Sequence, residues 1–227
     1  MQGVFVTATG TEVGKTRVAC ALASSLVAGG NRVAAIKPIE TGCDPDALDA
    51  NALGAACGMP SLASASGLYR AREPLAPYAV QKRGGPKVGP VSALAERVRE
   101  LSADVDFALV EGAGGVLVPI DETQMAVDLI AALALPAILV AANELGVQSF
   151  TLTAAEALER RSVPLRAVVL NDPRPMPKDL SRDSNREVLA DYLPGVTIVQ
   201  TPYTEDDAIL IEALGPVIRD LLPARGA

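Results

Sequence analysis

Gly14, Lys15 and Thr16 are the residues whose types and spacing most clearly predict chemistry. They follow the apolar stretch "VFVTATG" and precede a stretch typical of a helix. In such a loop the glycine lets the backbone approach a phosphate, and the amides of residues 12–17 point at the phosphate oxygens. The lysine would bridge the β- and γ-phosphates of a nucleoside triphosphate, and the threonine hydroxyl would ligate Mg²⁺. The strict pattern requires glycine at position 9, where Thr9 stands, so we predict a variant phosphate-binding loop; a simple glycine turn is the alternative.

A carboxylate that could complete a metal site ends the stretch "DFALVE" (106–111). Glu111 stands at the end of this predicted strand, where nucleotide-binding sheets place a second metal ligand. The following "GAGG" would let the backbone approach phosphate or substrate, and a solvated acid at a strand end is the alternative. Further acids stand at the start of the helix predicted over 46–57, where acidic side chains favour the helix dipole whatever their function. They are Asp44, Asp46 and Asp49.

A lysine ends another predicted strand. In "AAIKPIETG" (34–42) the residues before Lys37 are typical of a buried strand, and Pro38 restricts the lysine to extended backbone. Lysines are common where strands end at protein surfaces, so Lys37 alone predicts little. Beside a phosphate-binding loop, however, a cation fixed in this way would stabilise negative charge that develops during a reaction.

The stretch "VVLNDPRP" (168–175) ends a further predicted strand in Asn171. An asparagine amide donates and accepts a hydrogen bond at once, which matches the N6 and N7 edge of adenine. The sequence Asn-Asp-Pro is also a common turn former, and the chemistry of these residues favours neither interpretation.

Alternating strands and helices would position these residues. Apolar, β-branched stretches predict strands near 3–8, 32–37, 105–110, 136–142, 165–171 and 196–200. Stretches rich in Ala and Leu predict helices near 15–29, 46–57, 91–103, 124–134, 148–161, 181–193 and 206–222. The alternation predicts one α/β domain over residues 1–227, with a mostly parallel central sheet and helices on both faces, like that of P-loop nucleoside triphosphatases. Ligands of such sheets bind at the carboxyl ends of the strands.

Residues 60–90 do not follow this alternation. They contain five prolines and four glycines, without sustained periodicity. Long loops inside compact domains are usually functional or disordered. The segment is a candidate wall of the active site or a subunit contact, and a plain irregular excursion is the alternative. The side chains that suggest such a role are Tyr69, Arg70, Arg72 and Tyr78.

Composition excludes several classes of function. The net charge is −7, from 20 basic and 27 acidic residues, which is opposite in sign to that of most nucleic-acid-binding proteins. The sequence has no histidine, which excludes His-based zinc sites and Ser-His or Cys-His catalysis. The most apolar stretch, 133–142, has ten residues and is too short to span a bilayer. No secretory signal is visible, so we expect a cytoplasmic enzyme with neither nucleic acid nor membrane as partner.

Four motifs together resemble those of the dethiobiotin synthetases, a family of ATP-dependent carboxylase-cyclases. "TGTEVGKT" (9–16) resembles the phosphate loop of the family, "KPIETG" (37–42) its catalytic segment, "LVEGAGG" (109–115) its metal-binding turn and "LND" (170–172) its purine-reading strand end. The resemblance covers most of the chain in order. It implies that 7,8-diaminononanoate, CO₂ or bicarbonate and MgATP become dethiobiotin, ADP and phosphate, through a carbamate and a carbamic-phosphoric anhydride. It also implies a homodimer with active sites at the subunit interface.

The resemblance further implies a role for each matching residue. Lys37 and Lys15 become catalytic, and Thr16, Glu111 and Asp49 become the ligands of Mg²⁺, with Asp46 as the alternative to Asp49. ATP binding is implied for Glu12, Val13, Gly14, Lys15, Thr16, Arg17, Asp49, Glu111, Gly112, Ala113, Gly114, Asn171, Asp172, Pro202 and Tyr203. Substrate binding is implied for Thr11, Lys37, Thr41, Gly146, Val147, Gln148 and Ser149.

Two positions depart from the family pattern. Ala8 stands where the family usually has glycine, a change that would alter the geometry of the loop but leave Lys15 and Thr16 in place. "LGVQSF" (145–150) stands where the family usually reads Leu-Gly-x-(x)-Asn-His. There a helix N-terminus of the partner subunit is implied to receive the substrate carboxylate, and the backbone amides of residues 147–149 could still do so.

Two other classes of protein share parts of this pattern. Partitioning-type ATPases, which act as nucleotide-dependent dimer switches, usually have an additional lysine early in the loop, where this sequence has Gly10, Thr11 and Glu12. The synthetase part of a cobyrinate-type amidotransferase is accompanied by a glutaminase domain, for which we expect no room in 227 residues. The motifs therefore favour a dethiobiotin synthetase over both.

Overall fold

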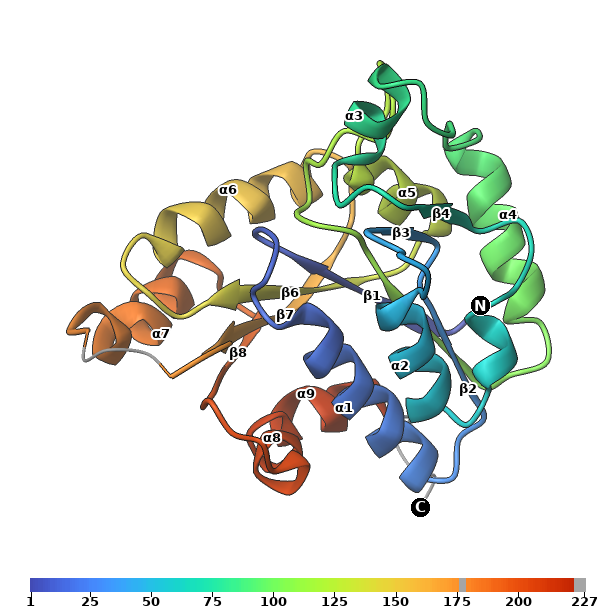
Figure 1. Cartoon of the computed structure of the whole chain (residues 1–227). Coiled ribbons are helices and arrows are strands. Elements are labelled where there is room, and N and C mark those ends of the chain that lie inside the picture. Colours follow the sequence, from blue (N-terminus) through green and yellow to red (C-terminus); the bar gives the residue numbers. More distant parts are fainter. Residues whose placement is uncertain (176–178, 223–227) are drawn as a thin grey trace.

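A six-stranded parallel sheet forms the centre of the computed structural model, which describes residues 1–175 and 179–222 (Figure 1). The strands lie in the order β2-β5-β1-β6-β7-β8, and all neighbours pair in parallel. All six predicted strands are present. Their bounds are β1 Gly3–Ala8, β2 Val33–Ile36, β5 Phe107–Glu111, β6 Ala137–Ala142, β7 Leu165–Asn171 and β8 Thr197–Thr201.

Apolar side chains on both faces explain why these segments form a parallel sheet. Every residue of β2 and β5 is buried, as is every residue of β1 after Gly3. Val, Ile, Leu and Ala suit strands that helices cover on both sides. In the central strand β5 the only charged residue is the last one, Glu111, so the sheet presents its chemistry at its carboxyl edge.

Helices cover the two faces of the sheet, as predicted. One layer contains α1 Lys15–Ala28, α2 Leu48–Ala56, α8 Asp207–Ala213 and α9 Gly215–Leu221. The other contains α4 Val91–Leu101, α5 Ala126–Leu133, α6 Val147–Glu159 and α7 Ser181–Tyr192. None of the helices in the described parts of the chain combines the length and hydropathy needed to cross a membrane.

The single helix predicted over 206–222 is in fact two helices. α8 ends at Ala213 and α9 begins at Gly215. Pro216 explains the break, because proline has no N–H to donate to the preceding turn and its ring clashes with the carbonyl four residues earlier. In the first turn of a new helix neither restriction applies, so α9 can begin there.

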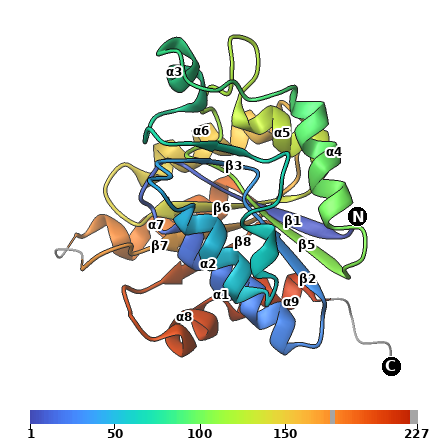
Figure 2. The same cartoon turned by 45° about the vertical axis from the view of Figure 1, so that its right-hand side comes forward.

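A second, two-stranded sheet lies at the same end of the molecule as the loop between β1 and α1 (Figure 2). β3 Ile39–Thr41 and β4 Tyr69–Ala71 pair in parallel, with Glu40 opposite Arg70. The sequence predicted neither strand, because three residues are too few to show a period. The rest of the segment 60–90 includes a 3₁₀ turn, Pro60–Leu62, and the short helix α3 Pro77–Lys82.

Candidate active site

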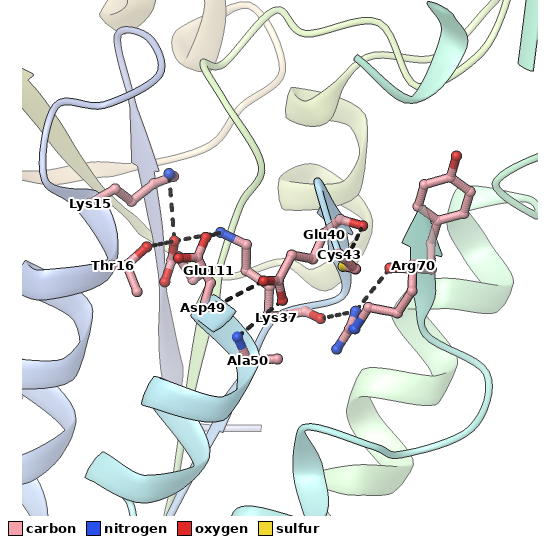
Figure 3. Close-up of polar contacts among 10 residues, drawn as sticks. Lys15, Thr16, Lys37, Glu40, Cys43, Asp49, Ala50, Arg70 and Glu111 are labelled. Atoms are coloured by element: carbon pink, nitrogen blue, oxygen red, sulfur yellow. Dashed lines mark hydrogen bonds and ion pairs between the residues drawn. The ribbon is translucent and has the colours of Figure 1, made fainter. Parts of the chain in front are cut away.

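The carboxylate of Glu111 is the centre of the candidate site (Figure 3). Glu111 is fully buried, and its Oε1 accepts hydrogen bonds from Lys37 Nζ at 2.6 Å and from Thr16 Oγ1 at 2.8 Å. Lys15 Nζ lies 3.5 Å from the same oxygen. β1, β5 and β2 are neighbours in the sheet, so the segments that follow them meet at one edge. Residues predicted from three separate motifs therefore converge on one atom.

Asp49, in the first turn of α2, provides a second carboxylate. Its Oδ2 accepts a hydrogen bond from Lys37 Nζ at 2.7 Å, so that lysine lies between two acids. The other acids predicted in this region lie at the surface: Asp44 pairs with Arg72, and Asp46 is exposed. The geometry thus favours Asp49 over Asp46 for the predicted metal shell.

The two lysines experience this acidic environment unequally. Burial acts to lower the pKa of Lys37, but attraction to Glu111 and Asp49 outweighs burial and the pKa is raised. Burial lowers the pKa of Lys15, and repulsion from Lys37 adds to this effect. Burial acts to raise the pKa of Asp49, yet the neighbouring Lys37 outweighs it and the pKa is lowered. Lys37 and Asp49 therefore hold each other in their charged forms.

These groups line a cleft of about 640 Å³ between the loop before α1 and the start of α2. The cleft brings together most of the residues predicted to bind phosphates and metal, and three of those predicted to bind substrate, Thr11, Lys37 and Thr41. Its wall consists of Thr11, Glu12, Gly14, Lys15, Thr16, Arg17, Lys37, Glu40, Thr41, Asp49, Pro74, Ala113, Gly114 and Pro173.

The loop before α1 has the backbone that anion binding requires. Gly14, the N-cap of α1, has a φ of 86°, in the left-handed region that favours glycine. A Cβ atom at Gly14 would lie 2.2 Å from Nδ2 of Asn171, so no side chain fits there. Ala8 is the buried last residue of β1, so the departure from the family at this position falls in the strand and not in the turn.

Asn171, at the end of β7, lies against the phosphate loop. Its Nδ2 donates to the carbonyl of Val13 at 2.8 Å, and its Oδ1 accepts from Thr201 Oγ1 at 2.7 Å. Each amide atom retains capacity for one more hydrogen bond, so bridging the two segments is compatible with reading a purine.

A cavity of about 420 Å³ lies near this end of the sheet, between β7, β8 and α7. Two predicted ATP-binding residues, Asp172 and Pro202, line it, and Tyr203 beside them is exposed. Asp172 forms an ion pair with Arg182, which lines the same cavity. Among the residues that the structure describes, the lining consists of Asn143, Asp172, Asp179, Arg182, Asp183, Gln200, Thr201 and Pro202.

The start of α6 lies outside the main cleft. Gly146 is its N-cap, with a φ of 95°, and Val147 is buried. The side chain of Gln148 donates to Asn185 Oδ1 on α7 at 3.1 Å. Ser149 lines a separate cavity of about 550 Å³, whose wall also includes Thr9, Gly10, Thr11, Leu117 and Phe150. Within this chain, the four residues at the start of α6 that were predicted to bind substrate therefore do not join Lys37.

The sequence did not predict a role for Glu40, and it did not decide between a functional and an irregular loop for the segment that contains Arg70. Glu40 lines the cleft, and its carboxylate accepts hydrogen bonds from the backbone at the start of α2. Arg70 donates to the carbonyl of Lys37. The Glu40 contacts join β3 to α2, and the Arg70 contact joins β4 to the residue after β2. Both are tertiary contacts of three-residue strands, which are too short to show a period in the sequence.

The oxygen donors of the site suit Mg²⁺, a hard cation. The Thr16 hydroxyl and the carboxylates of Glu111 and Asp49 are ligands of the kind that it prefers. Oε2 of Glu111 is buried and has no hydrogen-bond partner within the described residues, as expected of a ligand atom. Residues 1–175 and 179–222 contain no cluster of three or more His, Cys, Asp and Glu side chains, so phosphate oxygens and water would complete the coordination.

Comparison with known proteins finds relatives over most of the chain. A family model described as an AAA domain matches residues 2–206. The ATP-dependent dethiobiotin synthetase BioD of Caulobacter vibrioides is 39% identical over 207 residues, which cover 89% of this chain and 93% of the relative. The protein of the same name from Anaeromyxobacter dehalogenans is 37% identical over 219 residues, 96% of this chain and 97% of the relative.

Solved structures share the fold of this chain at low sequence identity. A chain of the MinC:MinD cell division protein complex of Aquifex aeolicus matches with a TM-score of 0.59 at 16% identity, covering 100% of this chain and 99% of that chain. A nucleotide-binding protein in complex with ADP from Archaeoglobus fulgidus matches with a TM-score of 0.54 at 19% identity. The match covers 96% of this chain and 88% of that chain. At these identities the match shows the fold alone, and it confirms the predicted P-loop type of fold.

Proposed function

The chain belongs to the dethiobiotin synthetase family and is an ATP-dependent ligase, and from this premise we propose the reaction of its active site. One amine of 7,8-diaminononanoate attacks CO₂ and loses a proton, which gives a carbamate. A carbamate oxygen then attacks the γ-phosphate of ATP, releasing ADP and forming a carbamic-phosphoric anhydride. The second amine attacks the carbonyl carbon of the anhydride and expels phosphate, which closes the ring of dethiobiotin.

The convergence of Lys15, Thr16 and Lys37 on Glu111 carries this proposal. Lys15 stands at the N-terminus of α1, where a phosphate is favoured, and Lys37 contacts the same carboxylate oxygen as Lys15. Both intermediates are anionic, and Lys37 is only 3% exposed, so its ammonium stabilises their charge with little competition from water. Positioning and electrostatics suffice for catalysis, and no covalent enzyme intermediate is needed.

Mg²⁺ would be held by Thr16, Asp49 and Glu111. When bound, it supplies positive charge to the phosphate oxygens of ATP. The unpartnered Oε2 of Glu111 supports this assignment. The chain itself orients the ligands: Lys37 donates to both carboxylates, and Thr16 donates to Glu111.

We place the purine of ATP in the cavity beside Asn171, with Asp172 and Pro202 in its wall. The free hydrogen-bonding capacity of the Asn171 amide supports this placement.

We further propose a cytoplasmic homodimer in which the start of α6 receives the substrate carboxylate across the interface. Exposed apolar side chains support this surface as the interface: Leu145 is 80% exposed and Phe150 63% exposed. Phe150 and Leu117 line the same cavity as Thr11, so a partner seated here would lie close to the phosphate loop.

The test is to measure dethiobiotin and phosphate with MgATP, 7,8-diaminononanoate and bicarbonate. We expect the two products in equal amounts, and no phosphate release when the diamine is omitted. A partitioning-type ATPase would release phosphate whether or not the diamine is present, and that result would contradict the proposal.

A further inference from the structure

A buried acid that has no part in the reaction described above lies in the wall of the cleft. Glu40, on β3, is 5% exposed and stands opposite Arg70 on β4 (Figure 3). Burial raises the pKa of Glu40, although hydrogen bonds from the backbone of Asp49 and Ala50 oppose this effect. A carboxylate is costly to bury unless it is hydrogen-bonded, so its partners indicate its role.

Both oxygens of Glu40 hold the N-terminus of α2. Oε1 accepts from the backbone N–H of Asp49 at 2.8 Å, and Oε2 accepts from the backbone N–H of Ala50 at 3.0 Å. Ala47, the N-cap residue of the helix, has no side-chain hydrogen bond there. Glu40 thus supplies from another strand the acceptor that a Ser or Asp N-cap usually provides. Two bonds to consecutive amides also restrict the rotation of α2 about its axis.

The helix that Glu40 holds carries Asp49 into the active site. Asp49 Oδ2 lies 2.7 Å from Lys37 Nζ, which in turn lies 2.6 Å from Glu111 Oε1. A rotation of α2 would move Asp49 away from this arrangement. The orientation of the Asp49 side chain, a proposed metal ligand, therefore depends on Glu40.

Arg70 holds the main chain just before β3, the strand that carries Glu40. Its Nη1 donates to the carbonyl of Lys37 at 2.9 Å and to the carbonyl of Tyr69 at 2.9 Å. The guanidinium remains charged even though burial lowers its pKa, and its planar fork fixes the place where β2 passes into β3. The charges around the cleft balance, with three cations, Lys15, Lys37 and Arg70, and three carboxylates, Glu40, Asp49 and Glu111, of which Arg70 and Asp49 are partly exposed.

We propose that Glu40 is a positioning residue for the metal shell, acting through the start of α2 on Asp49. It does not touch the metal or the substrate. The proposal rests on the proposed function, in which Asp49 is a ligand of Mg²⁺.

The test is binding of ADP in the presence and absence of Mg²⁺, measured by calorimetry, which does not depend on turnover. Glu40→Gln keeps the size of the side chain but presents an NH₂ group to one of the two backbone amides. We expect the gain in ADP affinity due to Mg²⁺ to fall about 10- to 100-fold, the range typical when a residue that orients a metal ligand is replaced. Binding of ADP without Mg²⁺ should not change, because Lys15 and the loop amides remain in place.

Asp106→Asn is the matched control. Asp106 accepts from the backbone N–H of Arg32 at 2.8 Å, at the opposite end of the sheet. This variant should lower the melting temperature without changing the effect of Mg²⁺ on ADP affinity. If Glu40→Gln does not fold, Glu40→Asp serves instead, because it keeps the charge and is too short to reach both amides.

A double-mutant cycle separates positioning from general stability. If Glu40 acts through Asp49, Glu40→Gln should cause little further loss of the Mg²⁺ effect in an Asp49→Asn background. The inference would be overturned if the losses of the Mg²⁺ effect in the two single variants added in full in the double variant. It would also be overturned if Asp49→Asn weakened the Mg²⁺ effect and Glu40→Gln left it unchanged. A wild-type protein that binds MgADP but forms no dethiobiotin would contradict the proposed function alone, and the binding data would still decide the role of Glu40.

Discussion

At the scale of residues, Oε1 of Glu111 receives hydrogen bonds from two side chains and lies 3.5 Å from a third, while Oε2 has no partner in the described chain. Glu111→Gln keeps the size of the side chain and removes its charge. We expect weaker Mg²⁺-dependent turnover, and a lower free energy of unfolding, because breaking a buried ion pair costs about 3–5 kcal/mol. A titration of activity with Mg²⁺ and denaturant unfolding measure the two effects. Full activity at every Mg²⁺ concentration would exclude a metal role for this residue.

The position of Lys37 allows a quantitative prediction for kcat, because this lysine lies between two carboxylates and lines the cleft. Lys37→Gln should lower kcat about 10²–10³-fold, which corresponds to about 3–4 kcal/mol for one preorganised donor. ATP affinity should fall much less, since Lys15 and the loop amides still hold the phosphates. Lys37→Arg should rescue activity only in part, because a planar fork does not replace a compact charge. Steady-state dethiobiotin formation and ATP binding measure the two effects, and near-normal kcat in Lys37→Gln would leave this lysine a structural ion-pair partner.

The side chain of Asn171 links the phosphate loop to β8, and we expect it to hydrogen-bond the purine of ATP as well. Asn171→Ala removes hydrogen bonds to the Val13 carbonyl and to Thr201. We expect weaker ATP binding and a smaller preference for adenine over other bases. Calorimetry with ATP and GTP separates the two roles: a uniform loss for both nucleotides would indicate that the bridge alone matters.

At the scale of elements, the sequence was sufficient for the six long strands and for most helices, because each is long enough to show its period or its buried apolar stretch. β3 and β4 have three residues each, and their pairing is a tertiary contact that no local pattern contains. The same reason explains the site: Lys37 and Glu111 stand at the ends of detectable strands, whereas Glu40 acts through tertiary hydrogen bonds to the start of α2, which no local pattern shows. The break between α8 and α9 could have been predicted from Gly215 and Pro216.

The turn between β1 and α1 depends on one backbone conformation. Gly14→Ala forces a side chain into the left-handed region, at a cost of about 1–3 kcal/mol, and places its Cβ against Asn171. We expect ATP affinity to fall at least about tenfold, because the loop must shift from the anion-binding turn. Gly30→Ala is the control, since Gly30 also has a positive φ but lies at the far end of α1 with open space around it. ATP binding by calorimetry should distinguish the two variants, and equal losses would mean that only stability is affected.

At the scale of the whole molecule, the main cleft lacks part of what the reaction needs. Its wall contains the groups proposed to bind phosphate and two of the three proposed metal ligands, Thr16 and Asp49, whereas the start of α6, proposed to bind the substrate carboxylate, lines a different cavity. Thr11 lines both, so the two cavities are adjacent. A second subunit that brings its own α6 towards Thr11 would complete the site, which explains why a dimer is expected to be the active form.

Phe150 tests this arrangement, because it is 63% exposed and lies one turn into α6. A dimer interface would bury its ring, so Phe150→Arg should place a charge in an apolar contact and shift the protein towards monomer. Tyr192→Arg is the control, because Tyr192 is 68% exposed but lines another cavity, at the C-terminal end of α6. Sedimentation velocity should show monomer only for Phe150→Arg, which should lose dethiobiotin formation and still bind ATP within its own cleft. A Phe150→Arg protein that remains dimeric and active would place the interface on another surface of the molecule.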